Sequence, residues 1–180
     1  PHLAIETYEA NANDNFFTEL AKLAKEQLDP ARTLYLEYSN ETWNGGFGQS
    51  TYCQNRGTRM NLASDGYSAS FKFHVYASSR MYDAFVKVFG DEINRVRWVV
   101  AGQLGSDWGT KMQLEALADP QINLGSRTPD YYTISNYAGA ADGNAADVAS
   151  QFRQALTEMV RQANVQKDLA AQRGMKLISY

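Results

Sequence analysis

The stretch "LYLEYSNETWNGGF", Leu34–Phe47, changes character in its middle. Its first five residues, rich in leucine and tyrosine, alternate in the manner of a β-strand. The residues that follow, from Ser39 to Asn44, place an amide, a carboxylate and an indole side by side. Such a break is typical of a strand that ends in a loop. We therefore predict a strand over Thr33–Tyr38 and, after it, a loop that presents functional groups.

Three further runs have the composition of short strands, and helical patterns lie between them. The other predicted strands are Arg95–Gly102, Tyr131–Ser135 and Met175–Ser179. The predicted helices are Phe16–Leu28, Phe71–Phe89, Thr110–Ala118 and Val148–Ala163, with a further helix near Phe47–Leu62. Strands that alternate with helices predict an α/β fold with parallel strands, either doubly wound or a barrel. In both architectures, functional residues gather at the carboxyl ends of the strands.

Composition narrows the function classes. The chain has 180 residues and a net charge of −3, which indicates one domain without a basic surface for nucleic acid. No apolar run approaches the length of a membrane span. Cys53 is the single cysteine, so neither an internal disulfide nor a cysteine metal site is expected. The glycines of Asn44–Gly48 lack the spacing of a nucleotide-binding loop, and we expect no cofactor and no metal.

The loop after the first strand carries groups that suit a sugar. Asn40 and Asn44 offer hydrogen bonds and Trp43 a stacking plane, which matches the polar edge and apolar face of a pyranose ring. A carboxylic acid beside an indole can have a raised pKa, as a general acid near neutral pH requires. By strand alternation, Glu37 and Glu41 are expected to point the same way. Two other interpretations are a solvated turn and an N-glycosylation sequon at Asn40–Thr42.

The wider string resembles a known family. "YLEYSNETWNGGF" is similar to the acid/base segment of clan A retaining glycoside hydrolases, which are (β/α)8 barrels, and in particular to a bacterial cellulase-like subgroup with a "vEySNEvWN" signature. "PHLA" (Pro1–Ala4) resembles the end of the third barrel strand, "VRWVVAGQ" (Val96–Gln103) the fifth, "DYYTISNYAG" (Asp130–Gly139) the sixth and "GMKLISY" (Gly174–Tyr180) the seventh. The resemblance departs at Ser135, where many members have histidine.

The resemblance implies a role for each candidate site residue. Glu41 would be the catalytic acid/base, Asn40 the partner of the sugar's 2-hydroxyl, and Tyr137 the residue that orients the nucleophile. The remaining candidates for substrate binding are Trp43 and Trp108 as stacking platforms, and Gln103 and His2 as polar contacts.

The resemblance also implies an incomplete barrel. A full barrel has eight strands in about 250 residues, whereas residues 1–180 supply about strands 4 to 7 with a stub of strand 3. We expect a partial catalytic domain truncated at both ends, inactive by itself, with the nucleophilic carboxylate just after Tyr180 and the missing half in the parent chain. Asp107 or Asp142 could serve only in an inverting arrangement, which needs about 6.5–9.5 Å between carboxyl groups.

Three function classes follow. The preferred one is a glycoside hydrolase that cleaves a polysaccharide or oligosaccharide by a retaining mechanism, for which a secreted or periplasmic location is favoured. The second is a non-catalytic carbohydrate-binding protein on the same scaffold. The third is a nucleotide-type α/β domain that interacts with proteins, against which the lack of a phosphate-binding loop counts.

Overall fold

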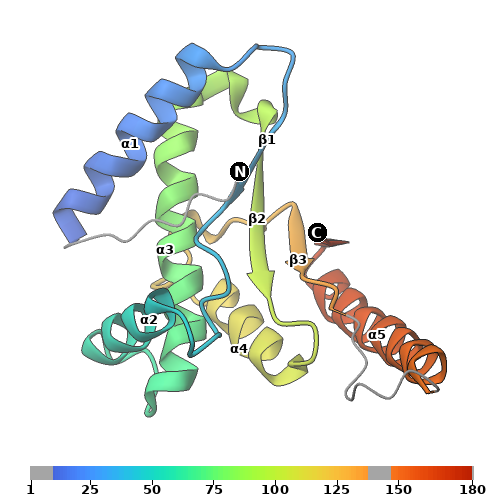
Figure 1. Cartoon of the computed structure of the whole chain (residues 1–180). Coiled ribbons are helices and arrows are strands. Elements are labelled where there is room, and N and C mark those ends of the chain that lie inside the picture. The colour runs from blue at the N-terminus through green and yellow to red at the C-terminus, as the bar shows by residue number, and fades with distance from the viewer. Residues whose placement is uncertain (1–9, 138–146, 180) are drawn as a thin grey trace.

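The computed structural model describes residues 10–137 and 147–179, which form alternating helices and strands (Figure 1). The helices are α1 (Ala10–Gln27), α2 (Gly48–Arg59), α3 (Gly66–Phe89), α4 (Asp107–Ala118) and α5 (Val148–Ala171). The strands are β1 (Leu34–Glu37), β2 (Val96–Gly102), β3 (Tyr131–Ile134) and β4 (Lys176–Ser179). Two short 3₁₀ turns, η1 (Gly90–Arg95) and η2 (Leu124–Ser126), complete these elements.

Every strand and helix predicted from the sequence is present, and the differences lie at the ends. α1 begins at Ala10, before the first residue of its apolar stripe, Phe16. α5 runs on to Ala171 and buries Leu169 and Ala170 in its last turns. An apolar stripe marks only the part of a helix that packs against the core, so helix ends are the least predictable feature.

The four strands form one parallel sheet in the order β1-β2-β3-β4. Leu36 pairs with Trp98, Val100 with Tyr132, and Tyr132 with Leu177. This confirms the predicted α/β class with parallel strands. Because all four strands point the same way, the loops that follow them leave the sheet at one edge.

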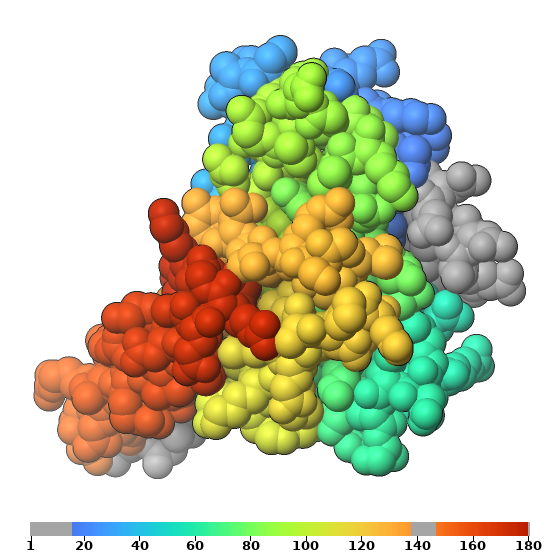
Figure 2. Space-filling model, turned by 180° about the vertical axis from the view of Figure 1, so that it is seen from behind, coloured from blue at the N-terminus to red at the C-terminus, as the bar shows by residue number. Residues whose placement is uncertain are grey.

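One face of the sheet packs against helices. Trp98, Val100, Tyr132 and Ile134 alternate along β2 and β3 and join one buried cluster with apolar residues of α3, α4 and α5. Seen from behind, α3, α4 and α5 spread across this side of the molecule (Figure 2). The main core therefore lies between the sheet and these helices.

The opposite face of the sheet borders an apolar cavity. Its walls include Tyr35, Val99, Thr133 and Ile178 from the four strands, together with leucines of α1, and its volume is about 720 Å³. The rings of Tyr35 and Tyr131 lie 5.7 Å apart on this face. Leu34, Leu36 and Phe85 also line this cavity, so it reaches from the face opposite the main core to α1 and α3 beside β1, the first strand of the sheet.

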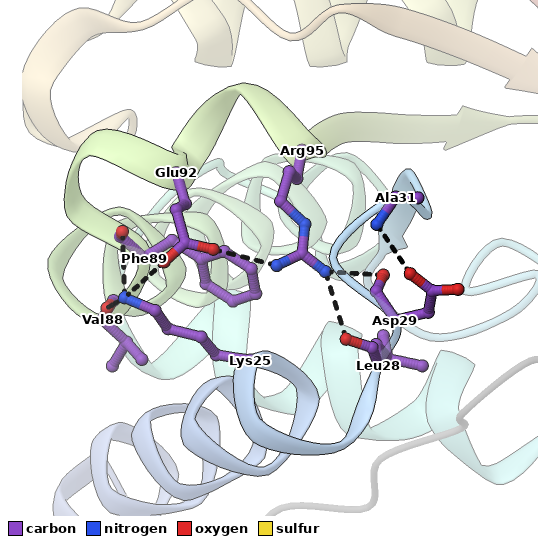
Figure 3. Close-up of polar contacts among 8 residues, drawn as sticks. All are labelled: Lys25, Leu28, Asp29, Ala31, Val88, Phe89, Glu92 and Arg95. Atoms are coloured by element: carbon purple, nitrogen blue, oxygen red, sulfur yellow. Dashed lines mark hydrogen bonds and ion pairs between the residues drawn. The ribbon is translucent and has the colours of Figure 1, made fainter.

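Lys25 of α1 binds the carboxyl-terminal end of α3. Its ammonium group donates hydrogen bonds to the carbonyl oxygens of Val88, at 3.1 Å, and Phe89, at 3.3 Å (Figure 3). It also pairs with the Glu92 carboxylate at 3.2 Å. The last carbonyls of a helix lack partners within the helix, and a cation there is favourable. Lys25 therefore fastens α1 to the end of α3.

Arg95, which directly precedes β2, makes the complementary contact with the end of α1. Its guanidinium donates to the carbonyl oxygens of Leu28, at 3.3 Å, and Asp29, at 2.9 Å, and to the Glu92 carboxylate at 3.0 Å (Figure 3). The side chain is only 14% exposed. Arg95 thus holds the start of β2 against the turn that leads from α1 into β1.

We predict that Arg95→Ala lowers the free energy of unfolding by about 1–3 kcal/mol, because three hydrogen bonds to a charged donor are lost from a largely buried position. Urea denaturation followed by circular dichroism measures this change. The control is Arg161→Ala, which removes an exposed pair with Glu158 and should change stability by less than about 0.5 kcal/mol. Equal effects of the two substitutions would contradict the role given to Arg95.

Candidate active site

The loop after β1 leaves the extended conformation at once. Ser39 and Glu41 have positive φ angles of 59° and 44°. Strand alternation holds only for extended backbone, so the expectation that Glu37 and Glu41 point the same way is wrong: Glu37 lines the apolar cavity beside α1, and Glu41 lines a different one. Left-handed backbone is unfavourable for residues other than glycine and persists only where the surroundings enforce it.

Contacts of Thr42 hold the loop in this backbone conformation. Thr42 is 2% exposed, and its hydroxyl lies 3.0 Å from Nδ1 of His74, a residue of α3 that is 1% exposed. The ring of Tyr38 meets the His74 ring edge to face, with centroids 5.7 Å apart. Burial lowers the pKa of His74 from 6.5 to about 4, so the imidazole is neutral at physiological pH. A buried polar contact therefore anchors the loop next to Glu41.

Trp43 also anchors the loop. It is 8% exposed and packs in a small cluster with Phe71 of α3 and Ala101 of β2. It borders the same cavity as Glu41, but most of its surface is covered by protein. Its position thus fixes the loop against the core and leaves little of the ring for a ligand.

Both oxygens of the Glu41 carboxylate accept hydrogen bonds. The Tyr137 hydroxyl, from the segment after β3, donates to Oε1 at 2.6 Å, and Asn44 Nδ2 donates to Oε2 at 2.9 Å. Asn44 is oriented in turn, because its Oδ1 accepts from the backbone N–H of Gly46 at 3.0 Å. The hydrogen bond to Glu41 raises the pKa of Tyr137, since ionising the phenol would lose it beside a carboxylate. Glu41 is therefore a carboxylate oriented from two loops.

Glu41 lines a cavity of about 530 Å³ at the carboxyl edge of the sheet. Its wall is assembled from the segments after β1, β2 and β3 and from α3 and α5. The lining residues with polar or aromatic side chains are Glu41, Trp43, Asn44, Tyr67, Gln103, Ser135, Tyr137 and Gln162. Within the described ranges, Glu41 is the single carboxylate of the wall, and no lysine or arginine lines it. The cavity thus offers one acid among neutral hydrogen-bonding groups.

A buried network of amides supports the part of the wall that follows β2. Gln113 of α4 donates to the carbonyl oxygen of Ala101 at 2.8 Å, and Gln166 of α5 donates to that of Leu104 at 3.0 Å. The Tyr132 hydroxyl donates to Gln113 at 2.6 Å and lies over Gly102, where a Cβ atom would come within 1.7 Å of it. Glycine at position 102 is therefore required for the network that fixes the loop carrying Gln103.

The structure brings together some of the predicted site residues. Glu41, Trp43, Gln103 and Tyr137 share the cavity wall, although Tyr137 follows Glu41 by 96 positions. Asn40 adjoins Glu41 without lining the cavity, and its carbonyl oxygen accepts from Gln49 at 2.7 Å. His2 lies outside the described residues.

Two further predicted candidates do not line the cavity. Trp108 is 42% exposed on α4 and stacks on Tyr67, which does line it. Asp107 pairs with Lys111 at 3.3 Å, and this contact lowers the pKa of Asp107. Asp142 lies outside the described residues. Asp107 is therefore not a second acid of the cavity wall.

Sequence reasoning missed His74, Tyr67 and Gln162. A histidine on the apolar stripe of α3, beside Phe71 and Val75, was a signal for a buried polar contact. Tyr67 stands in the first turn of α3, and Gln162 on the polar surface of α5, so neither departs from an ordinary helix pattern. Only the packing of these helices beside the loops shows their part in the cavity.

Comparison with protein-family models, with curated proteins and with solved structures finds no match to the chain. Among the described helices, none has the length and apolar character needed to span a membrane. The described residues also hold no group of three or more histidine, cysteine, aspartate or glutamate side chains suited to a metal. Function is therefore argued from the cavity at Glu41.

We predict that stability falls as the pH drops from 6.5 to about 4. In this window the unfolded chain protonates His74, whereas the folded protein keeps it neutral, so folding loses up to about 3 kcal/mol. Urea denaturation at several pH values measures the slope. His74→Gln should flatten it. An unchanged slope in His74→Gln would contradict the assignment.

We also predict that the pKa of Tyr137 falls towards its ordinary value in Glu41→Gln, because the substitution removes the hydrogen bond to a carboxylate, which raises this pKa most, together with the negative charge that disfavours the phenolate. Carbon-13 labelling of the tyrosine ring, followed by NMR titration, measures it. Asp107→Asn is the control, since that carboxylate contacts Lys111 instead. The contact would be refuted if Tyr137 titrates identically in the wild type and Glu41→Gln.

Proposed function

We propose that the cavity is the acid/base half of a retaining glycoside hydrolase active site, with Glu41 as the catalytic acid/base. The observation that supports this most is the orientation of one carboxylate, by Tyr137 at 2.6 Å and Asn44 at 2.9 Å, in a cavity otherwise walled by neutral polar and aromatic groups. Carbohydrates are recognised by such groups, and a general acid must lie within hydrogen-bond reach of the oxygen it protonates.

The strand order supports the proposal that the sheet is part of a (β/α)8 barrel. A doubly wound sheet reverses its strand order at the point where ligands bind, whereas the described strands follow one another as β1-β2-β3-β4 without reversal. Val99, Thr133 and Ile178 lie outside the main core cluster and border a cavity, as side chains inside a barrel would, and α1 forms another part of its wall. The proposed domain is thus about half of such a barrel, with the other half in the parent chain.

In the proposed reaction, Glu41 first gives its proton to the glycosidic oxygen as the bond to the leaving group breaks. A second carboxylate forms a covalent bond to the sugar, and Glu41 then removes a proton from the water that releases it. Asn44 and Tyr137 keep the Glu41 oxygens in place through both steps. Gln103 and Gln162 offer amides for sugar hydroxyls on the same wall.

The second carboxylate is proposed to follow Tyr180. Ser179 ends β4 and pairs with Ile134, which ends β3, so a residue just past Ser179 leaves the sheet at the same edge as Tyr137. A retaining mechanism needs about 5–5.5 Å between the carboxyl groups. The Tyr137 hydroxyl, 2.6 Å from Glu41, then lies where it can also contact a carboxylate at that separation. This agrees with the role in orienting the nucleophile that the resemblance implies for Tyr137.

One observation favours a second candidate function, non-catalytic carbohydrate binding. Glu41 is the single carboxylate that lines the cavity in the described part of the chain. A site with one acid and several amides and aromatics can hold a sugar without cleaving it. Glu41 transfers a proton in the first function and only contacts the sugar in the second. The substitution Glu41→Gln therefore distinguishes the two functions.

We predict that Glu41→Gln in the complete gene product lowers kcat/KM on unactivated oligosaccharides by about 10²–10⁴-fold, because the leaving oxygen is no longer protonated. The same variant should keep most of its kcat/KM on 2,4-dinitrophenyl glycosides, whose leaving group departs without a proton. Steady-state rates on both substrate types measure the difference.

The control is Glu37→Gln, which changes the same residue type at the end of β1, four positions before Glu41, and lines the other cavity; it should retain wild-type rates. Equal losses on both substrate types in Glu41→Gln would contradict the acid/base role. A wild-type protein that binds oligosaccharides without hydrolysing them, and whose affinity Glu41→Gln leaves unchanged, would establish the binding function instead.

A further inference from the structure

Two exposed aromatic rings lie beside the Glu41 cavity. Tyr67 and Trp108 are each 42% exposed, and their rings are stacked with centroids 5.7 Å apart and planes inclined by only 9°. Tyr67 lines the cavity, whereas Trp108 lies beyond it. The two rings are therefore stacked on each other beside the cavity, and the aromatic area open to a ligand is on the outer side of the stack.

Buried protein contacts hold the Tyr67–Trp108 pair in place. Phe71, which is 1% exposed, meets the Tyr67 ring edge to face at 5.2 Å and the Trp108 ring edge to face at 5.6 Å. Tyr67 belongs to the first turn of α3, where Asp65 caps the helix by accepting from the Ser68 N–H at 2.8 Å. Trp108 belongs to the first turn of α4, capped by Ser106 at 3.1 Å from the Gly109 N–H. Both rings are thus held on helix starts and need little ordering when a ligand binds.

The surroundings of the pair suit a sugar ring better than a charged ligand. Gln103 and Gln162 lie on the same cavity wall as Tyr67, and no lysine or arginine among the described residues lines it. A phosphate group would meet no cation in this wall. Trp43 is mostly covered by protein, and Tyr137, although 73% exposed, is held at Glu41 by its hydroxyl group. Tyr67 and Trp108 are two further rings with accessible area beside the cavity.

We propose that the site binds a carbohydrate chain of at least two rings, with one ring at Glu41 and a neighbouring ring stacked on the Tyr67–Trp108 pair. This rests on the proposed function, since it takes the Glu41 cavity to bind a sugar, and it makes the substrate class oligosaccharide or polysaccharide rather than a single glycoside. Aromatic rings bury a large area at small entropic cost, so the second ring supplies a substantial part of the affinity.

The test compares binding of hexasaccharides and monosaccharides to the full chain by isothermal titration calorimetry. The probes are cellohexaose, xylohexaose and mannohexaose, with glucose, xylose and mannose. We expect at least one hexasaccharide to bind, and Trp108→Ala and Tyr67→Ala each to weaken it by about tenfold. Affinity for the monosaccharides should not change in Trp108→Ala, because Trp108 lies beyond the cavity. Phe152→Ala, which removes a ring that is 44% exposed on α5, is the matched control and should bind as the wild type does.

A second variant, Trp108→Tyr, keeps an aromatic face. It tests whether the weaker hexasaccharide binding of Trp108→Ala comes from the lost ring or from a loss of folding. Its hexasaccharide affinity should lie closer to the wild type than that of Trp108→Ala, with equal thermal unfolding temperatures. Hexasaccharide binding that survives both alanine substitutions, or absence of binding to any probe, would overturn the inference. The proposed function is judged separately, since dinitrophenyl glycosides carry a single sugar and the acid/base signature of Glu41→Gln on them does not need the aromatic pair.

Discussion

The parallel alignment of the four strands is the constraint on which the site depends. Parallel strands in sequential order bring every strand end, and so every following loop, to one edge of the sheet. Glu41 follows β1, Gln103 follows β2 and Tyr137 follows β3, so residues far apart in the chain meet in one cavity. The hydrogen bond from Tyr137 to Glu41 exists because β1 and β3 both flank β2 and point the same way. A shift of either pairing would separate these two side chains.

Buried polar contacts make this arrangement rigid. The Thr42–His74 contact fixes the loop of Glu41, and the amides of Gln113 and Gln166 fix the loop of Gln103. The Thr42–His74 and Gln166–Leu104 contacts join a loop to a helix, and the Gln113–Ala101 contact joins the end of β2 to α4. Unpaired polar groups are costly in the interior, so these contacts favour one loop conformation over its alternatives. The left-handed backbone at Glu41 is therefore held by the burial of the next two residues, Thr42 against His74 and Trp43 against Phe71.

Local patterns in the sequence predict the elements well, because apolar periodicity follows directly from burial on one face. The position of Glu41 just after a strand is also predicted by such a local pattern. The meeting of Glu41 and Tyr137 depends on strand register, and the roles of His74 and Tyr67 depend on how α3 packs; neither is encoded in neighbouring residues. Strand alternation also failed at Glu37 and Glu41, because it assumes extended backbone and the loop bends at Ser39. Glu41 and three of its neighbours in the cavity, Trp43, Gln103 and Tyr137, were thus named from the sequence, whereas the contacts of His74, Tyr67 and Gln162 were not.

The measurement that tests the central claim most directly is the sequence of the coding DNA past the codon for Tyr180. A retaining mechanism needs a second carboxylate at the sheet edge where Glu41 and Tyr137 meet, and β4 reaches that edge at Ser179. We expect a glutamate codon immediately after Tyr180, followed by the remaining strands of the barrel. A stop codon, or an open frame without a carboxylate at that strand end, would contradict a hydrolytic role for Glu41.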